Sequence, residues 1–257
     1  MTTELSNKTI LVTGASRGIG EATARHFAAE GANVVMMARS AARLEEIEVE
    51  IRAGGGAVTV CTGDVSAYGD VAAAVDGAVK EYGGLDVLVN NAGVIDPIAR
   101  LADSDPTEWD KVVDINVKGV YHGLRAAIPA MLESGGGTVI NISSGAATNA
   151  LEGWSHYCCT KAAVLSLTAC ADKEYGSQGI RVVGLSPGTV ATEMQVSIKA
   201  SGINPVSQLD PSVHIPTEWV AKAAAYLVGD GGAAYAGRDF SIKTDEGRKA
   251  VGLPAVS

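Results

Sequence analysis

The sequence predicts an α/β fold, a single-domain doubly wound parallel sheet with helices on both of its faces. Short apolar runs alternate along the chain with longer stretches in which apolar residues recur at helical spacing. Strands that are apolar throughout are covered on both faces. Repeated strand–helix–strand units joined by short glycine-rich turns build a parallel sheet with right-handed crossovers. No proline- or serine-rich linker divides the 257 residues, so we expect one domain over residues 1–257.

The expected elements follow in strict alternation. Each strand is a short run dominated by Val, Ile, Leu or Met, at residues 9–13, 33–37, 57–61, 85–90, 138–143, 181–186 and 238–243. Each helix shows apolar spacing of three to four, at residues 19–30, 41–53, 71–82, 107–120 (with continuation toward 132 left open), 157–175 and 217–228. Residues 93–105 and 189–216 are longer loops after strand ends, where open α/β sheets bind their ligands. Residues 244–257 are expected to form a polar tail.

Composition excludes several classes of protein. An apolar content of 47% with 19% charged residues excludes a disordered chain. No apolar run reaches the roughly 18 residues of a membrane span, and the N-terminus lacks a signal-peptide pattern, so we expect a cytoplasmic protein without membrane contact. A net charge of −9 argues against nucleic acid as a partner. The four cysteines have no paired spacing, which predicts reduced thiols, with Cys158 and Cys159 as small buried apolar residues; we expect no metal site.

A glycine-rich turn follows the first expected strand. Gly14, Gly18 and Gly20 stand between the run at residues 9–12 and a helical pattern. Glycines there allow a tight turn and a close approach of backbone to a phosphate, while the helix N-terminus favours the anion. The pattern therefore predicts a Rossmann-type dinucleotide site, although a strand-to-helix turn can carry glycine for backbone reasons alone.

A tyrosine and a lysine are spaced for cooperation. Tyr157 and Lys161 stand at i and i+4, on one face of the expected helix. A neighbouring cation stabilises a phenolate, so we expect Lys161 to lower the pKa of Tyr157 toward the working range. An unrelated surface pair is the alternative.

Three further polar positions are candidates for the same site. Ser144 ends a strand and could donate to a carbonyl oxygen, or it could be a turn residue leading into Gly145. Asn116 is a poor helix former inside an expected helix and could also be a cap or surface residue. The Asn90 to Gly93 segment, also at a strand end, could be a plain turn.

Taken together and in order, these motifs resemble the short-chain dehydrogenase/reductase family. The resemblance rests on residues 13–20 and 90–93, on Asn116, Ser144, Tyr157 and Lys161, and on the segment 186–189, and it runs from about residue 8 to residue 240. It implies an NAD(P)-dependent oxidoreductase that interconverts a carbonyl and an alcohol. It also implies a homodimer or homotetramer. The last expected strand lacks the Asp-Gly-Gly ending usual in the family, which leaves the subunit contact there open.

The resemblance assigns roles to residues. Tyr157 would exchange the proton, Lys161 would lower its pKa and hold the nicotinamide ribose, Ser144 would polarise the carbonyl, and Asn116 would hold a relay water. The remaining implied cofactor residues are Gly14, Ser16, Arg17, Gly18, Ile19, Gly20, Arg39, Asp64, Val65, Asn90, Ala92, Gly93, Pro187, Gly188, Val190 and Thr192.

The second expected strand indicates which nicotinamide cofactor binds. An acidic residue at its end would accept from the ribose 2′-hydroxyl of NAD, whereas basic residues bind the 2′-phosphate of NADP. Here no carboxylate is present, and Arg39 and Arg17 are expected at the same pocket. The sequence therefore predicts NADPH and reduction, although each arginine could also be a solvated surface residue.

The expected substrate wall is apolar. Its candidates are Val94, Ser144, Ala146, Trp154 and Met194. Such a wall favours a small hydrophobic ketone, aldehyde or diketone. His156 is expected to be a hydrogen-bonded residue at the helix start rather than a substrate contact.

Three other functions remain as alternatives. A 3-oxoacyl-thioester reductase would need a basic patch at the mouth, but Arg100 and Lys199 are the only cations in the two loops. An alcohol dehydrogenase would use the same residues in the oxidising direction. A non-catalytic sensor of the cofactor would be expected to have lost Tyr157 or Lys161, and both are present.

Overall fold

The computed structural model describes residues 5–256 and confirms the doubly wound α/β class. Seven strands form one parallel sheet in the order β3-β2-β1-β4-β5-β6-β7. The strands are β1 (Thr9–Thr13), β2 (Asn33–Ala38), β3 (Ala57–Thr62), β4 (Val87–Asn90), β5 (Gly137–Ile142), β6 (Ile180–Ser186) and β7 (Asp239–Ser241). The strand order reverses beside β1, so the carboxyl ends of β1 and β4 open the crevice in which such sheets bind ligands.

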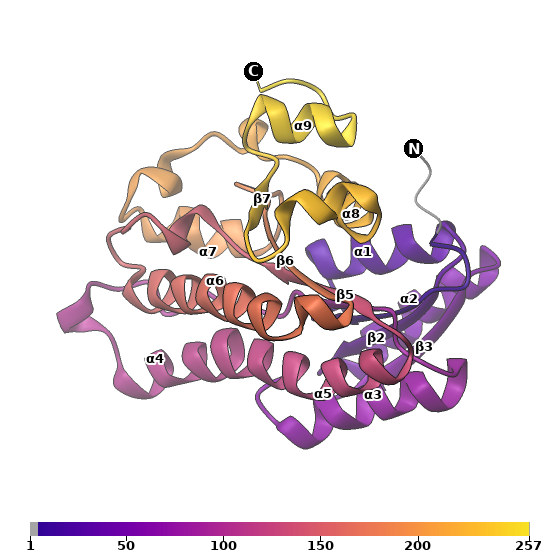
Figure 1. The fold of residues 1–257 in the computed structure, drawn as a ribbon. Coiled ribbons are helices and arrows are strands. Elements are labelled where there is room, and N and C mark those ends of the chain that lie inside the picture. The colour runs from indigo at the N-terminus through magenta and orange to yellow at the C-terminus, as the bar shows by residue number, and fades with distance from the viewer. Residues whose placement is uncertain (1–4, 257) are drawn as a thin grey trace.

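The helices cover both faces of this sheet (Figure 1). They are α1 (Gly18–Ala29), α2 (Ala41–Ala53), α3 (Tyr68–Tyr82), α4 (Pro106–Val113), α5 (Gly119–Glu133), α6 (Ser155–Tyr175), α7 (Met194–Ser201), α8 (Thr217–Val228) and α9 (Asp245–Val251). One apolar core joins the sheet to α1, α2 and α8, and a second joins it to α3, α5 and α6. This two-sided burial explains why the strands are apolar throughout.

The expected helix at residues 107–120 contains an irregularity that the sequence did not reveal. Helix α4 begins behind Asp105, whose carboxylate accepts the N–H of Glu108, and the chain passes through a π-helical segment (Asp114–Lys118) directly into α5. A π-helical turn widens the helix by one residue and re-aims the side chains that follow. It carries Asn116, which is buried.

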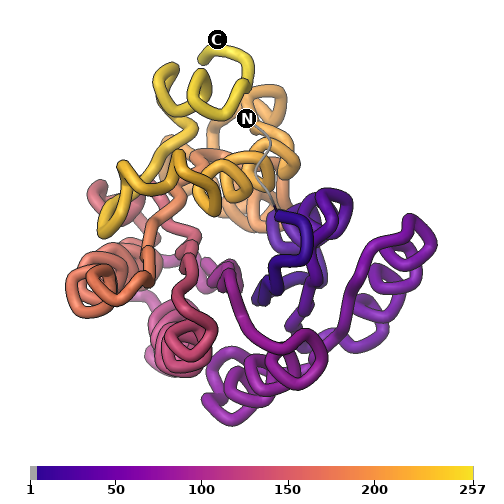
Figure 2. Tube along the Cα trace, turned by 45° about the vertical axis from the view of Figure 1, so that its right-hand side comes forward, coloured from indigo at the N-terminus to yellow at the C-terminus, as the bar shows by residue number. Residues whose placement is uncertain are grey.

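The C-terminal part also differs from expectation. Strand β7 is shorter than the predicted 238–243. The polar tail contains α9, which lies at one end of the molecule in Figures 1 and 2, and Leu253 behind it is buried. Arg248 of α9 lies over the ring of Trp219 on α8, 5.2 Å from its centroid. The tail therefore packs onto the domain through an apolar residue and a cation–π contact.

Two smaller observations complete the fold. All four cysteines are free, as expected, but Cys159 is exposed rather than buried, because adjacent positions on a helix point about 100° apart and only Cys158 turns partly inward. None of the helices within residues 5–256 combines the length and the apolar character that a bilayer crossing requires.

Candidate active site

The glycine-rich turn after β1 depends on its glycines. Gly14 and Gly18 have φ angles of 64° and 56°, in the left-handed region that favours glycine. A Cβ on Gly20 would lie 2.3 Å from the carbonyl oxygen of Gly14, and one on Gly14 would lie 2.9 Å from the Cα of Ala92. The turn is therefore packed against the segment after β4 with no room for side chains.

Asn91, which the sequence reasoning did not single out, holds this turn in place. Its amide donates to the carbonyl oxygens of Thr13 (2.9 Å) and Gly14 (3.2 Å). The Thr13 hydroxyl in turn accepts the N–H of Asn91 at 3.0 Å. Asn90, predicted to line the cofactor cleft, instead donates its side chain to Asn141 in the buried centre of the sheet. The two adjacent asparagines differ because successive strand residues point to opposite sides.

The start of α1 suits a phosphate. Its N-cap residue, Arg17, is extended and no side chain caps the helix, so the first N–H groups are open to an anion. On the far side, Thr192 approaches the turn, because a Cβ on Gly18 would lie 3.3 Å from its methyl group. The residues of this groove therefore fit the diphosphate of a dinucleotide.

Gly20→Ala should weaken cofactor binding by at least about tenfold and destabilise the protein by about 1–3 kcal/mol, because its methyl group would meet the Gly14 carbonyl. The matched control is Gly77→Ala on α3, where no atom lies within 4 Å of an added Cβ. That control should raise stability by up to about 1 kcal/mol through helix propensity. Fluorescence titration with cofactor and thermal unfolding measure both effects. Equal behaviour of the two variants would contradict this account of the turn.

Tyr157 and Lys161 lie on the first turns of α6, facing the sheet. Both are buried. The ammonium of Lys161 donates to the carbonyl oxygen of Ile142 at 2.7 Å and lies 5.5 Å from the centroid of the Tyr157 ring. The i, i+4 spacing thus brings the phenol and the cation together at the carboxyl end of β5.

The pKa of Tyr157 differs from the expectation. Burial raises it to about 12, and the neighbouring Ser144 hydroxyl only partly opposes that rise. The predicted lowering of the Tyr157 pKa is therefore wrong, because burial disfavours the charged phenolate. A phenol in this state keeps its proton at neutral pH and can donate it.

Burial shifts the pKa of Lys161 in the opposite direction from that of Tyr157. Burial lowers its pKa to about 8, and the carboxylate of Asp239 opposes that shift. Lys161 therefore holds its proton at neutral pH and loses it only slightly above.

Asn116 clamps the chain beside this pair. Its side-chain oxygen accepts the N–H of Val94 and its amide donates to the Val94 carbonyl, both at 2.9 Å. The amide also reaches Thr160 on α6 at 3.2 Å. A Cβ on Gly93 would lie 3.4 Å from the Asn116 oxygen and 3.9 Å from the Lys161 nitrogen, which places Gly93 between them. Asn116 therefore joins the loop after β4 to the lysine-bearing helix.

An apolar cluster covers the tyrosine on the expected substrate side. It contains the predicted residues Ala146 and Trp154, with Met194 packed against it, together with Ile95 and Ile198. The Trp154 ring meets the Tyr157 ring edge to face, with centroids 5.6 Å apart. His156 is buried and bonds the Ile95 carbonyl through Nε2, as expected for a helix-start histidine. The segments before α4 and around α7 thus meet over Tyr157.

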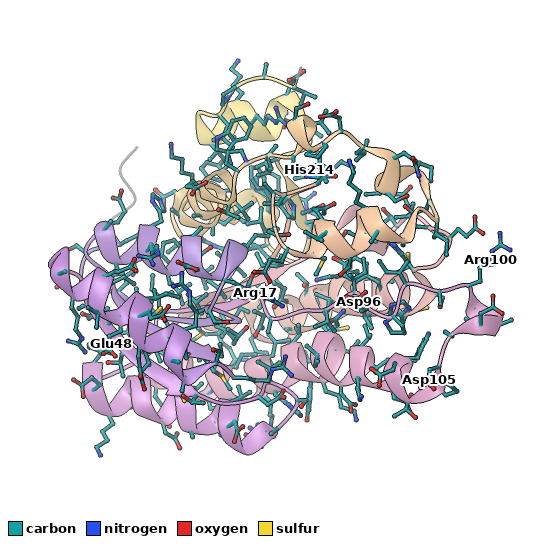
Figure 3. All side chains as sticks on the ribbon, turned by 180° about the vertical axis from the view of Figure 1, so that it is seen from behind. Arg17, Glu48, Asp96, Arg100, Asp105 and His214 are labelled. Carbon is teal, nitrogen blue, oxygen red and sulfur yellow. The ribbon has the colours of Figure 1, made fainter. Side chains whose placement is uncertain are left out.

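The two arginines expected at one pocket each form an ion pair. Arg39, at the end of β2, lies 3.9 Å from the carboxylate of Asp64, whereas Arg17 pairs with Glu193 after β6. Figure 3 shows Arg17 near the middle of this face and Arg100 at its outer margin. Each arginine pairs with a different carboxylate, and both side chains are more than two-thirds exposed, so their convergence on one pocket stays a prediction.

Further residues predicted from the resemblance are fixed by neighbouring segments of the chain. Gly188 has a φ of 86°, and a Cβ there would lie 2.7 Å from the Lys243 side chain. Val190 forms a bridge with Ile215 that ties the loop after β6 to the start of α8. His122 bonds the Val65 carbonyl at 2.8 Å, fixing the segment after β3. Chemically, the site offers a proton donor and a cation beside a groove suited to a dinucleotide.

Comparison with known proteins identifies the family that the motifs resemble. The family model for short chain dehydrogenases matches residues 8–202. The 3-oxoacyl-[acyl-carrier-protein] reductase FabG of Staphylococcus aureus is 40% identical over 190 residues, which cover 73% of this chain and 76% of that protein. An uncharacterized oxidoreductase of Schizosaccharomyces pombe is 39% identical over 196 residues, 76% of each chain.

Solved structures agree at the level of the whole chain. Levodione reductase superposes with a TM-score of 0.86 at 28% identity, covering 95% of this chain and 98% of that one. A short-chain type dehydrogenase/reductase from Mycobacterium marinum gives the same TM-score, 0.86, at 32% identity, covering 94% and 96%. The shared fold therefore extends beyond the matched family segment.

Proposed function

The chain belongs to the short-chain dehydrogenase/reductase family of NAD(P)-dependent oxidoreductases, and from that premise we propose that it reduces a small hydrophobic ketone, aldehyde or diketone with NADPH. The observation that carries the proposal is the placement of the Tyr157 phenol beside Lys161 and beneath an apolar cluster. The substrate class follows from that cluster, which is built from apolar side chains.

The chain's own residues divide the work of reduction. Bound nicotinamide supplies the hydride. Tyr157 donates its proton to the substrate oxygen, and Ser144 donates a hydrogen bond to the same oxygen. Lys161 stabilises the phenolate that remains. Asn116 holds the loop after β4, where the resemblance implies a relay water that returns a proton to Tyr157. The apolar cluster excludes water from the reacting carbonyl.

The pKa values favour reduction over oxidation. Reduction starts from a protonated phenol, and burial keeps Tyr157 protonated well above neutral pH. Oxidation of an alcohol starts from the phenolate, which this environment disfavours. The alternative of an alcohol dehydrogenase, which would use the same residues, is therefore less favoured than a reductase.

Arg39 supports the choice of NADPH. It ends β2, where a carboxylate that would select NAD is missing, and its side chain is 70% exposed, so it is free to turn toward a 2′-phosphate. Arg17 is held by Glu193 and contributes only if that pair opens.

Arg39→Asp should raise the dissociation constant for NADPH by about tenfold or more and lower that for NADH, since a carboxylate repels the 2′-phosphate and accepts from a 2′-hydroxyl. Arg100→Gln is the control, because its side chain is also 70% exposed and also paired with a carboxylate, that of Glu152. Calorimetric titration of both cofactors measures the preference. An unchanged ratio of the two constants in Arg39→Asp would refute the assignment.

A 3-oxoacyl-thioester reductase is the second candidate, favoured by the 40% identity to the Staphylococcus aureus enzyme. An acidic carrier protein would need cations at the mouth of the site. Arg100 is paired with Glu152 at the outer margin (Figure 3). Lys199 on α7 is exposed. The net charge of −9 also opposes an acidic partner.

Oxidation of NADPH and NADH over a panel of aryl ketones, 1,2-diketones, aldehydes and a 3-oxoacyl thioester tests the proposal. We expect turnover with NADPH on the apolar carbonyls. Preferred turnover of the thioester would establish the second candidate. Cofactor binding without turnover on any carbonyl would leave the sensor or the alcohol-oxidising function in its place.

A further inference from the structure

A half-buried carboxylate that the proposed mechanism does not use lies near the anchor of Lys161. Asp239 begins β7, the edge strand of the sheet. Its Oδ2 accepts a hydrogen bond from the Ser143 hydroxyl at 2.7 Å, and its Oδ1 is buried without a partner within residues 5–256. A carboxylate oxygen buried in this way is costly unless something nearby compensates its charge.

The route of this side chain across the sheet is specific. Asp239 is paired in register with Gly184 on β6, while Ser143 follows β5, the strand beyond. A Cβ on Gly184 would lie 1.7 Å from the Asp239 Oδ1. Only a glycine at 184 therefore allows the carboxylate to cross its neighbouring strand and reach Ser143.

The carboxylate arrives next to the anchor of Lys161. Ser143 directly follows Ile142, whose carbonyl oxygen receives the Lys161 ammonium at 2.7 Å. The two charges lie beyond salt-bridge distance, yet Asp239 raises the pKa of Lys161 and Lys161 lowers that of Asp239, each against the effect of burial. In a poorly solvated interior, charges interact over longer distances than in water.

Other charges around Asp239 are engaged elsewhere or solvated. The charged side chains on the surrounding elements are Asp172, Arg181, Arg238 and Lys243. Asp172 accepts the N–H of Val182, and Arg181 donates to carbonyls at the end of α8. Arg238 and Lys243 are exposed at the rim of an open hollow of about 680 Å³, which Asp239 and Ser144 also line.

We propose that Asp239 is a positioning residue. Ser143 holds it in the space left by Gly184, and there it keeps the buried ammonium of Lys161 charged. A charged Lys161 can then stabilise the Tyr157 phenolate. The Ser143 bond also fixes the strand end that carries Ser144. The inference rests on the proposed function only in that Lys161 takes part in the reaction.

The test is an NMR titration of Lys161 in the full-length protein, free of cofactor and substrate, with lysine ¹³C-labelled at Cε and the Lys161 signal assigned by its loss in Lys161→Met. Asp239→Asn keeps the shape and removes the charge, so the Lys161 midpoint should fall by about one pH unit or more. Glu246→Gln, which removes an exposed carboxylate from α9, should leave it unchanged. A folded Asp239→Asn protein with an unchanged midpoint would overturn the proposal.

A second variant keeps the proposal testable if Asp239→Asn does not fold. Ser143→Ala keeps the charge but removes the hydrogen bond that holds the carboxylate toward the anchor of Lys161, so Asp239 can turn into the open hollow. The Lys161 midpoint should then fall in the same direction by a smaller amount, and no change would overturn the proposal. Neither titration requires turnover, so the two hypotheses are tested separately. A protein that fails to reduce carbonyls can still show the shift of the Lys161 midpoint, and an active reductase can still lack that shift.

Discussion

Tyr157→Phe should lower the turnover number for carbonyl reduction by about 10²–10⁴-fold while leaving the fold and the cofactor dissociation constant close to those of wild type. The variant removes the phenolic proton donor that lies beside Lys161 and Ser144, and it keeps the aromatic ring that packs edge to face on Trp154. Steady-state kinetics with NADPH measures the loss, and a cofactor titration confirms that binding survives.

The control for this variant is Tyr175→Phe, at the far end of α6. Tyr175 packs against the core on the α3, α5 and α6 side, remote from the site. It should retain nearly full activity. If Tyr157→Phe keeps more than about half of the wild-type turnover, the phenol is not the proton donor and the mechanism fails.

Lys161→Met should lower kcat/KM by more than about 10²-fold. It should also remove the free energy that burial of the charged ammonium costs at neutral pH, a cost that disappears as the pH rises. The folded protein releases the Lys161 proton near pH 8, whereas the unfolded chain holds it to about 10.5. Between these values the unfolded state binds more protons, so stability rises with pH in wild type. Relative to Lys161→Met, the wild-type free energy of unfolding should therefore rise by about 1–3 kcal/mol from pH 7 to pH 10.

Urea unfolding of both proteins across this pH range measures the difference. Lys173→Met, at an exposed position on the same helix, serves as the control and should run parallel to wild type at every pH. If the free energy of unfolding changes with pH in the same way for wild type and Lys161→Met, burial does not lower the pKa of Lys161.

The sheet could be predicted from the sequence because its signals are local. An apolar run such as residues 33–37 can be covered on both faces only inside a parallel sheet, and the structure places it at Asn33–Ala38. The π-helical segment at Asp114–Lys118 could not be predicted, since it depends on contacts that Asn116 makes with Val94 and Thr160, far away in the chain.

The candidate site divides in the same way. Tyr157 and Lys161 are neighbours along one helix, so their spacing alone predicts their proximity. The pKa of Tyr157 depends on how deeply the apolar cluster buries it, and spacing carries no such information. Asp239 reaches Ser143 across one strand, β6, through the gap left by Gly184, a contact that only the register of β6 and β7 reveals.

Transfer of deuterium tests the central claim most directly. Wild-type protein is incubated with the best apolar carbonyl from the panel and with NADPH that carries deuterium in place of both hydrogens at C4 of the nicotinamide. By mass spectrometry the alcohol should carry one deuterium on its carbinol carbon. Tyr157→Phe should yield almost none in the same time. A product without deuterium, or equal incorporation by the two proteins, would contradict a reductase in which Tyr157 supplies the proton.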